Sequence, residues 1–234
     1  MLKKITYILL ILVIPLGLSA QERKVQNRPY IDYRLLHYGF FVGLHTQDIE
    51  LVNNGFITEN GESWYADVKN YTPGLTVGVL AELRMTTHFA LRLMPTMHFG
   101  QSELTFREQG SGEISRQQLK TTYIATPLHL KCSAERFNNY RPYITMGVSP
   151  MVNLTVKKQQ QMLVKRFDAM IEVGFGCDFY LPFFKLIPEL KFAFSPLDIL
   201  QKERKDLLDA NMLKFTNSLD RASSKMITLT FYFE

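Results

Sequence analysis

The chain lacks several features that would assign it to a common class. After its first twenty positions, the 234-residue sequence has no run of 18 apolar residues, which excludes a membrane protein built from spanning helices. The chain has little excess of one charge. Without the two lysines of residues 1–20, 27 − 2 = 25 basic side chains stand against 22 acidic ones, so the net charge is +3. So mild an excess argues against a nucleic-acid partner. Only two cysteines are present, and we interpret them as small apolar side chains rather than a redox or metal pair.

The first twenty residues have the layout of a cleaved secretory signal. Lys3 and Lys4 precede a long apolar run, which ends in Leu18-Ser19-Ala20 before a polar stretch. No lipoprotein cysteine is present, and an uncleaved anchor helix is the alternative. We therefore predict a cleaved signal peptide over 1–20.

Strict alternation of apolar and polar residues dominates the rest of the chain. Between Phe167 and Phe179 every odd position is apolar, while acid or glycine holds five of the six even ones. This is a β-strand with one apolar and one polar face. Eight such strands are predicted, over 38–46, 74–85, 89–104, 119–132, 141–154, 167–179, 184–195 and 225–234. Strands this long and regular are typical of transmembrane β-barrels.

The connections between these strands alternate in length. Residues 86–88, 133–140 and 181–183 form short turns, whereas 47–73, 105–118, 155–166 and 196–224 form long loops. Outer-membrane barrels have short periplasmic turns and long extracellular loops. The predicted fold is therefore all-β: an eight-stranded antiparallel transmembrane barrel in a Gram-negative outer membrane, with both termini periplasmic. The outer-membrane β-barrel would span 38–234, and 21–37 would be a periplasmic N-terminal segment. Cys132 and Cys177 would then lie about 10 Å apart on strands two apart, too far for a disulfide.

A soluble barrel such as a lipocalin would show the same alternation with its apolar face inward. Three observations favour lipid on the apolar side. Glycines gather on the polar face, as expected where eight strands crowd a narrow interior. Aromatic residues gather at one rim, and the last strand ends in Phe231-Tyr232-Phe233-Glu234, which resembles the C-terminal signal for outer-membrane insertion. The rim aromatics are Tyr38, Phe89, Phe179, Phe184 and Phe233.

Prolines fall inside several of the predicted strands. Because proline cannot donate a backbone hydrogen bond to the sheet, we expect bulges or broken pairing at Pro95, Pro127, Pro150 and Pro188.

The polar face carries charges of both signs. These are Glu82, Arg84, Arg92, His98, Lys131, Asp168, Glu172, Asp178, Lys185, Glu189 and Lys191. Burying them is tolerable only if they pair, which predicts a salt-bridged plug; an ion or proton path is the alternative, but eight strands leave no aqueous channel. Asp168, Glu172 and Asp178 would need basic partners, and the candidates are Arg84, Arg92, Lys131, Lys185 and Lys191.

No arrangement of residues predicts catalysis. His98 and His129 would face inward at different heights, His45 would lie near the first loop, His88 in a turn and His37 before the barrel. No spacing suits a serine–histidine–acid triad or a metal site. We therefore expect a protein that is not an enzyme, with no catalytic, cofactor-binding or metal residue, no cofactor and no small-molecule substrate.

Two loops are candidate interaction surfaces. Ser195-Pro196 predicts a helix start, and the apolar stripe Leu200, Leu207, Leu208 and Met212 would either cap the barrel or bind a partner. The loop over 155–166 carries Lys157, Lys158, Lys165 and Arg166. It is either a solvated basic turn or a surface that attracts anionic glycans or lipopolysaccharide.

Two stretches resemble a known family. Asn27 to Phe40 is similar to the entry of the first strand in the PorT family of Bacteroidetes outer-membrane proteins, and so is Phe167 to Phe194, with Asp178-Phe179-Tyr180-Leu181-Pro182 and Pro188-Glu189-Leu190-Lys191-Phe192. The resemblance implies a barrel required by the type IX secretion system, which exports cargo with a conserved C-terminal domain and, in gliding relatives, surface adhesins. It brings no catalytic residues.

The first hypothesis is thus a non-enzymatic component or assembly factor of type IX secretion that is not itself the conduit. Its partners would be outer-membrane lipid and other secretion components. The alternatives are a small barrel that acts in adhesion or surface binding through its loops, and a barrel enzyme acting on lipid or surface polymer. The segment from Asn27 to Leu36 is either an ordered element against the periplasmic rim or a polar lead into the first strand.

Overall fold

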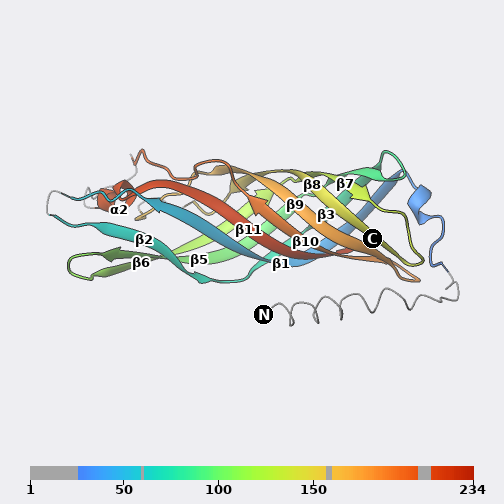
Figure 1. Ribbon diagram of the computed structural model, residues 1–234, viewed down its shortest axis with the longest axis horizontal. Coiled ribbons are helices and arrows are strands. Elements are labelled where there is room, and N and C mark those ends of the chain that lie inside the picture. Colours follow the sequence, from blue (N-terminus) through green and yellow to red (C-terminus); the bar gives the residue numbers. More distant parts are fainter. Residues whose placement is uncertain (1–25, 59–60, 157–159, 205–211) are drawn as a thin grey trace, which may run out of the picture.

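The computed structural model describes residues 26–58, 61–156, 160–204 and 212–234. The predicted signal peptide lies outside these residues. The described chain forms an elongated antiparallel β-barrel whose strands cross the long axis obliquely (Figure 1). Within this described part, no helix is long and apolar enough to cross a membrane.

Eleven strand segments of the described residues build the barrel. They are β1 (Leu36–Asn53), β2 (Trp64–Tyr71), β3 (Gly74–Arg84), β4 (Phe89–Leu93), β5 (Thr96–Glu108), β6 (Ile114–Ala125), β7 (Leu128–Ser133), β8 (Tyr140–Asn153), β9 (Phe167–Tyr180), β10 (Lys185–Phe194) and β11 (Leu219–Phe233). Their order is β2-β5-β6-β8-β7-β4-β3-β1-β11-β10-β9, and β8 pairs with β9 to close the ring. Because β2 and β3, β4 and β5, and β6 and β7 are successive parts of three interrupted strands, the ring has eight strands, which confirms the predicted fold.

Prolines cause the interruptions. Pro95 separates β4 from β5, and Pro127 separates β6 from β7. Each proline carbonyl still serves the sheet: Pro95 accepts from Val79 N–H at 3.1 Å and Pro127 from Met94 N–H at 3.0 Å. Broken pairing is therefore confirmed at both positions, and the sheet replaces the lost ladder with bonds to the proline oxygens.

The other two prolines remain inside strands. Pro150 stays within β8, where its carbonyl accepts from Thr126 N–H at 3.1 Å. Around Pro188 in β10, the ladder to β9 stops after Leu186 and resumes at Glu189 with no change of register. Pro73, which lies between β2 and β3, interrupts a third strand, whose first part, β2, lies in the predicted loop 47–73.

The barrel has two unlike ends, and we name them by their residues. The turn end holds the short connections 85–88, 134–139 and 181–184, together with the ends of β1 and β11 at Leu36 and Phe233. The far end holds β2, the β5–β6 hairpin and the short helix α2 (Leu213–Asn217), at the opposite extremity (Figure 1). The three short turns are thus confirmed at one end, but the connection 109–113 at the far end is equally short, so the predicted strict alternation of short and long connections was wrong.

The apolar face of the strands points outward. Phe167, Val173 and Phe175 of β9 are exposed, and so is Tyr38 at the start of β1. The polar partners on β9, such as Glu172, are buried in the barrel. Such a band is the surface that barrels present to lipid, so the predicted orientation of the two faces is confirmed.

This orientation inverts toward the far end. Along β1 the outward residues change from apolar, ending at Leu44, to polar at Asp48 and Glu50, while the inward residues change from polar His45 to apolar Ile49. Strands β5, β6 and β11 change in the same way. The far end therefore projects beyond the lipid-facing band with the polarity of a soluble protein.

An apolar cluster fills the far end. Its buried members are Ile49, Trp64, Ala66, Val68, Leu104, Phe106, Leu119, Met162, Val164, Ile199, Leu200, Phe215, Leu219 and Ala222. Phe215 comes from α2 and contacts the rings of Trp64 and Phe106, each at a centroid distance of 4.9 Å. We call this set the far-end cluster.

Two loop predictions were wrong. No helix starts at Pro196; instead the Ser195 hydroxyl donates to Asp168 Oδ1 at 2.5 Å and accepts from Leu197 N–H. Much of the predicted long loops is strand, because β1, β5, β6 and β11 extend into the far end. Leu200 packs in the far-end cluster, which agrees with a capping role, whereas Leu207 and Leu208 lie outside the described residues.

Candidate functional site

An ion-pair network fills the lumen between the middle of the barrel and its turn end. At its centre lies Arg92 of β4, which is fully buried. Its Nε lies 2.5 Å from Glu82 Oε2 on β3, and its Nη1 lies 2.9 Å from Glu189 Oε2 on β10. Tyr143 and Tyr232 also donate to Glu189, at 2.6 and 2.8 Å. One cation thus links strands on two sides of the barrel.

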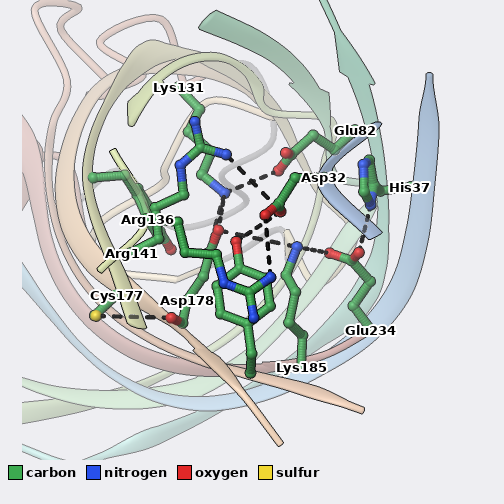
Figure 2. A network of polar contacts seen from close by, with 12 residues as sticks. Asp32, His37, Glu82, Lys131, Arg136, Arg141, Cys177, Asp178, Lys185 and Glu234 are labelled. Carbon is green, nitrogen blue, oxygen red and sulfur yellow. Dashed lines mark hydrogen bonds and ion pairs between the residues drawn. The ribbon is translucent and has the colours of Figure 1, made fainter. Parts of the chain in front are cut away.

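The network continues toward the turn end (Figure 2). Lys131 Nζ lies 2.8 Å from Asp178, and Lys185 Nζ lies 2.7 Å from Glu234 and 3.9 Å from Asp178. His37 Nδ1 lies 2.5 Å from the other oxygen of Glu234. His37 is therefore part of the lumen rather than of a segment before the barrel, because β1 begins at Leu36.

A second group of polar side chains lies deeper in the lumen. Glu172 Oε2 lies 3.0 Å from His129 Nε2 and 3.4 Å from Lys191 Nζ. Beyond it, the Thr76 hydroxyl lies between His45 Nδ1 at 2.8 Å and His98 Nδ1 at 2.9 Å. The far-end cluster follows, so the polar lumen ends against apolar side chains.

Most of the predicted charges pair as expected. Glu172 and Asp178 find Lys191 and Lys131, and Glu82 and Glu189 share Arg92. Two residues differ from the prediction. Asp168 accepts from Ser195 instead of a base, and no ion pair among the described residues includes it. Arg84 lies at the rim, where its guanidinium is 5.7 Å from the Tyr33 ring centroid.

Glycines make room for this filling. A Cβ at Gly78 would lie 2.5 Å from the Phe41 ring and 2.4 Å from the carbonyl oxygen of Pro95. A Cβ at Gly147 would lie 2.1 Å from the Leu128 carbonyl oxygen. These contacts are too short for any side chain, which explains why glycines occupy the inward face.

The N-terminal segment closes over the turn end. Residues 26–34, which we call the strap, include a single 3₁₀ turn, η2 (Ile31–Tyr33). Asn27 N–H donates to Asn139 Oδ1 at 2.9 Å, and its side-chain amide donates to the Tyr180 carbonyl at 3.0 Å. Arg28 Nη1 donates to the main-chain oxygen of Glu234 at 3.1 Å. The strap is therefore an ordered element of the barrel's end.

Asp32 is the main anchor of the strap (Figure 2). Its Oδ1 accepts from the Tyr180 hydroxyl at 2.7 Å, and its Oδ2 accepts from Arg136 Nη1 at 3.4 Å. Arg136 also donates to the Asn27 carbonyl and stacks over Tyr180, with 3.6 Å from its Cζ to the ring centroid. Sequence reasoning missed Arg136 because it lies in a turn, outside any alternating segment.

The side chains that could serve catalysis or metal binding lie apart or in one small arrangement within the described residues. Its acidic, histidine and cysteine side chains form no group of three or more able to hold a metal ion. The His45–Thr76–His98 arrangement joins a hydroxyl to two imidazoles, but all three are buried and no acid completes it. Cys132 and Cys177 are free thiols. The arrangement is suited to holding strands together.

The family model for the outer membrane protein beta-barrel domain matches residues 19–200. The chain belongs to this outer-membrane β-barrel family. No curated protein matches it. The family assignment agrees with the outward apolar band and places this outer-membrane barrel in membrane lipid.

Several solved structures resemble this outer-membrane barrel. OprG of Pseudomonas aeruginosa is 13% identical with a TM-score of 0.40. The aligned residues make up 85% of this chain and 91% of OprG. AlkL, solved in lipid bilayers, is 11% identical with a TM-score of 0.39 over 92% of this chain and 95% of AlkL. The attachment invasion locus protein Ail of Yersinia pestis is 11% identical with a TM-score of 0.35 over 84% and 96%. Similarities this distant support no conclusion about the function of the barrel.

Proposed function

We propose that this barrel serves type IX protein secretion as a non-enzymatic component or assembly factor and is not itself the conduit. The observation that carries the proposal is where the PorT-like residues lie. Asn27, Arg28 and Asp32 of the first stretch contact Tyr180 and Glu234 at the end of the barrel, and Tyr180 belongs to the second stretch. The residues that carry the resemblance therefore form one structural unit, the strap docked on the turn end.

The filling of the lumen supports a role other than conduction. Arg92, Lys131 and Glu189 are buried in ion pairs across the barrel. The far-end cluster closes the opposite side with apolar side chains. An exported polypeptide would have to displace both layers, so we assign this barrel a scaffolding or assembly role.

We propose further that the turn end faces the periplasm. Short turns on that side are typical of outer-membrane barrels. The strap would then be available to periplasmic or membrane-embedded secretion components, whereas the far end would face the outside. Membrane-impermeant maleimide applied to intact cells tests this orientation. In a chain with both native cysteines replaced by alanine, Ile57→Cys at the far end should react, whereas Phe183→Cys at the turn end should not.

Removal of the strap tests the secretion role. In a deletion strain complemented with a chain lacking residues 27–34, we expect normal barrel levels in the outer membrane but cargo retained in the periplasm. The matched control replaces residues 109–113, the exposed turn of the β5–β6 hairpin, with a serine–glycine stretch of equal length. Normal export without the strap would refute the role of the strap. Normal export in the full deletion strain, with altered adhesion, would favour the surface-binding alternative.

A further inference from the structure

A cavity of about 400 Å³ lies between the strap and the rim of the turn end. From the strap, Asp32 and Tyr33 line it, and from the barrel and its turns come Arg84, Arg136 and Arg141, of which the last two appear in Figure 2. Ligand cavities in proteins typically measure about 300–1,000 Å³. We call this space the strap cavity, and it has room for a small polar group.

Positive charge is in excess along the wall of the strap cavity. Three guanidinium groups line it together with two carboxylates, those of Asp32 and Glu135. Asp32 already accepts from the Tyr180 hydroxyl at 2.7 Å and from Arg136 Nη1 at 3.4 Å, and Glu135 is exposed to solvent. The net positive charge favours an anionic group in the cavity.

Two of the arginines keep donors for such a group. The Arg84 guanidinium makes no hydrogen bond or ion pair with any residue that the structure describes, and it lies 5.7 Å from the Tyr33 ring centroid. Arg141 is held in place because it donates to the carbonyls of Ala134 and Thr87. A guanidinium carries five N–H donors, so both side chains can donate further. Phosphate is an acceptor that matches the fork of a guanidinium.

The lumen network closes the inner side of this site. A smaller cavity of about 20 Å³, room for one water molecule, shares Arg84 and Arg141 with the strap cavity. Its wall also includes Asp178 and Lys185, which are buried in the lumen network. A ligand therefore enters from outside the barrel and goes no deeper than the two arginines.

The strap cavity lies at the edge of the lipid-facing band. Leu83 and Met85, which flank Arg84 in the chain, are both exposed apolar residues. Tyr33 and Tyr38 are exposed at the same end, and tyrosines of membrane proteins gather at the level of the lipid headgroups. A lipid whose chains cover Leu83 would thus have its phosphate at the level of Arg84.

We propose that the strap cavity binds the phosphate group of a phospholipid from the leaflet at the turn end, with Arg84 and Arg141 donating to its oxygens. The bound phosphate ties the strap to the rim, because Asp32 and Tyr33 of the strap line the same cavity. Inorganic phosphate presents the same oxygens without the chains, so the test includes both. The site does not depend on the proposed secretion role.

Native mass spectrometry of the purified full chain in detergent tests the proposal. The probe is dioleoyl phosphatidylglycerol, and dioleoylglycerol, which has the same chains but no phosphate, is the control ligand. The unmodified chain should retain one phosphatidylglycerol and no dioleoylglycerol. Arg84→Gln should weaken retention by about tenfold or more, since it removes a charged hydrogen-bond donor. Arg34→Gln is the matched control, because Arg34 is an exposed arginine of the strap outside the cavity, and it should bind as the unmodified chain does.

Two further measurements keep the test decisive. Arg84→Lys keeps the charge and should recover part of the lost affinity, which separates loss of the site from loss of the fold. Displacement of the lipid by an equal concentration of inorganic phosphate would confirm the phosphate site with free phosphate as its ligand. Equal retention of phosphatidylglycerol and dioleoylglycerol, equal retention by Arg84→Gln and the unmodified chain, or preferred retention of a glutamate-rich peptide would overturn the proposal.

Discussion

Arg92 and Glu189 lie 97 positions apart in the sequence, yet Arg92 Nη1 donates to Glu189 Oε2 at 2.9 Å inside the barrel. Replacing Arg92 with leucine would leave Glu82 and Glu189 buried without this cation. We expect the variant to lose about 3–5 kcal/mol of unfolding free energy, the usual cost of removing one partner of a buried ion pair. Urea titration of the folded band, which migrates faster on gels without heating, measures it.

Arg116→Leu is the matched control for this prediction. Arg116 lies 3.8 Å from Glu103 on the outer surface, and its side chain is 61% exposed. Exposed pairs contribute about 0–1 kcal/mol, so this variant should unfold close to the unmodified chain. Equal urea midpoints for the two variants would contradict a stabilising role of the lumen network.

The strap should loosen when its anchor is removed. In Tyr180→Phe, Asp32 loses the hydrogen bond that the Tyr180 hydroxyl donates to it. A hydrogen bond to a charged group contributes about 1.5–3 kcal/mol to stability. We expect trypsin to cleave after Arg34 roughly tenfold faster or more, because each 1.4 kcal/mol changes an equilibrium tenfold. Tyr140→Phe, which leaves Asp32 untouched, should behave as the unmodified chain. Unchanged cleavage in Tyr180→Phe would show that Asp32 does not hold the strap.

Trp64 is the single tryptophan of the chain and reports directly on the far-end cluster. Phe215→Ala removes a ring that lies edge-on to it at 4.9 Å. We expect the Trp64 fluorescence to shift to the red. The free energy of unfolding of the far end should fall by about 3–5 kcal/mol, because removal of a large buried ring leaves a cavity. Phe137→Ala at the turn end should leave the spectrum unchanged. The absence of a shift in Phe215→Ala would argue against the packing of α2 on Trp64.

The contact between α2 and β2 should weaken in acid. Lys214 Nζ donates to Glu62 Oε2 at 2.8 Å and, with the Trp64 indole N–H, lowers the pKa of Glu62 below its ordinary 4.5. A carboxyl group with a lowered pKa stabilises the folded state above 4.5 and loses that contribution as the pH falls through its folded pKa. Trp64 fluorescence should therefore change below pH 4.5, and Glu62→Gln should lack that transition. A transition that persists in Glu62→Gln would assign it to another group.

Alternation predicted the membrane-spanning part of each strand but not its full length. Along β1 the outward residues are Tyr38 to Leu44 on even positions, and the alternation continues past Thr46 with Ile49 and Leu51 apolar on odd positions. A prediction that requires the same face to stay apolar ends the strand where the apolar residues move from even to odd positions. The strand continues because water replaces lipid outside while apolar side chains fill the inside.

The pairing of lumen charges was predictable as a class but not residue by residue. Face assignment placed Arg92, Glu189 and Lys131 inside, where charges must pair. It could not reveal that Asp168 is matched by the Ser195 hydroxyl, because the height of a residue depends on strand stagger. The strap was also open to two interpretations, since its partners Asn139 and Arg136 come from a distant turn.

The inversion of polarity along β1 and β11 determines how deep the barrel sits in the bilayer. Sinking the far end would bring Lys225 and Glu50 into hydrocarbon, at a cost that grows with depth. Raising it would expose Leu44 and Ile227 to water. Both displacements are opposed at the same level of the wall, so the bilayer surface stays at a fixed height relative to the level at which β1 and β11 change polarity.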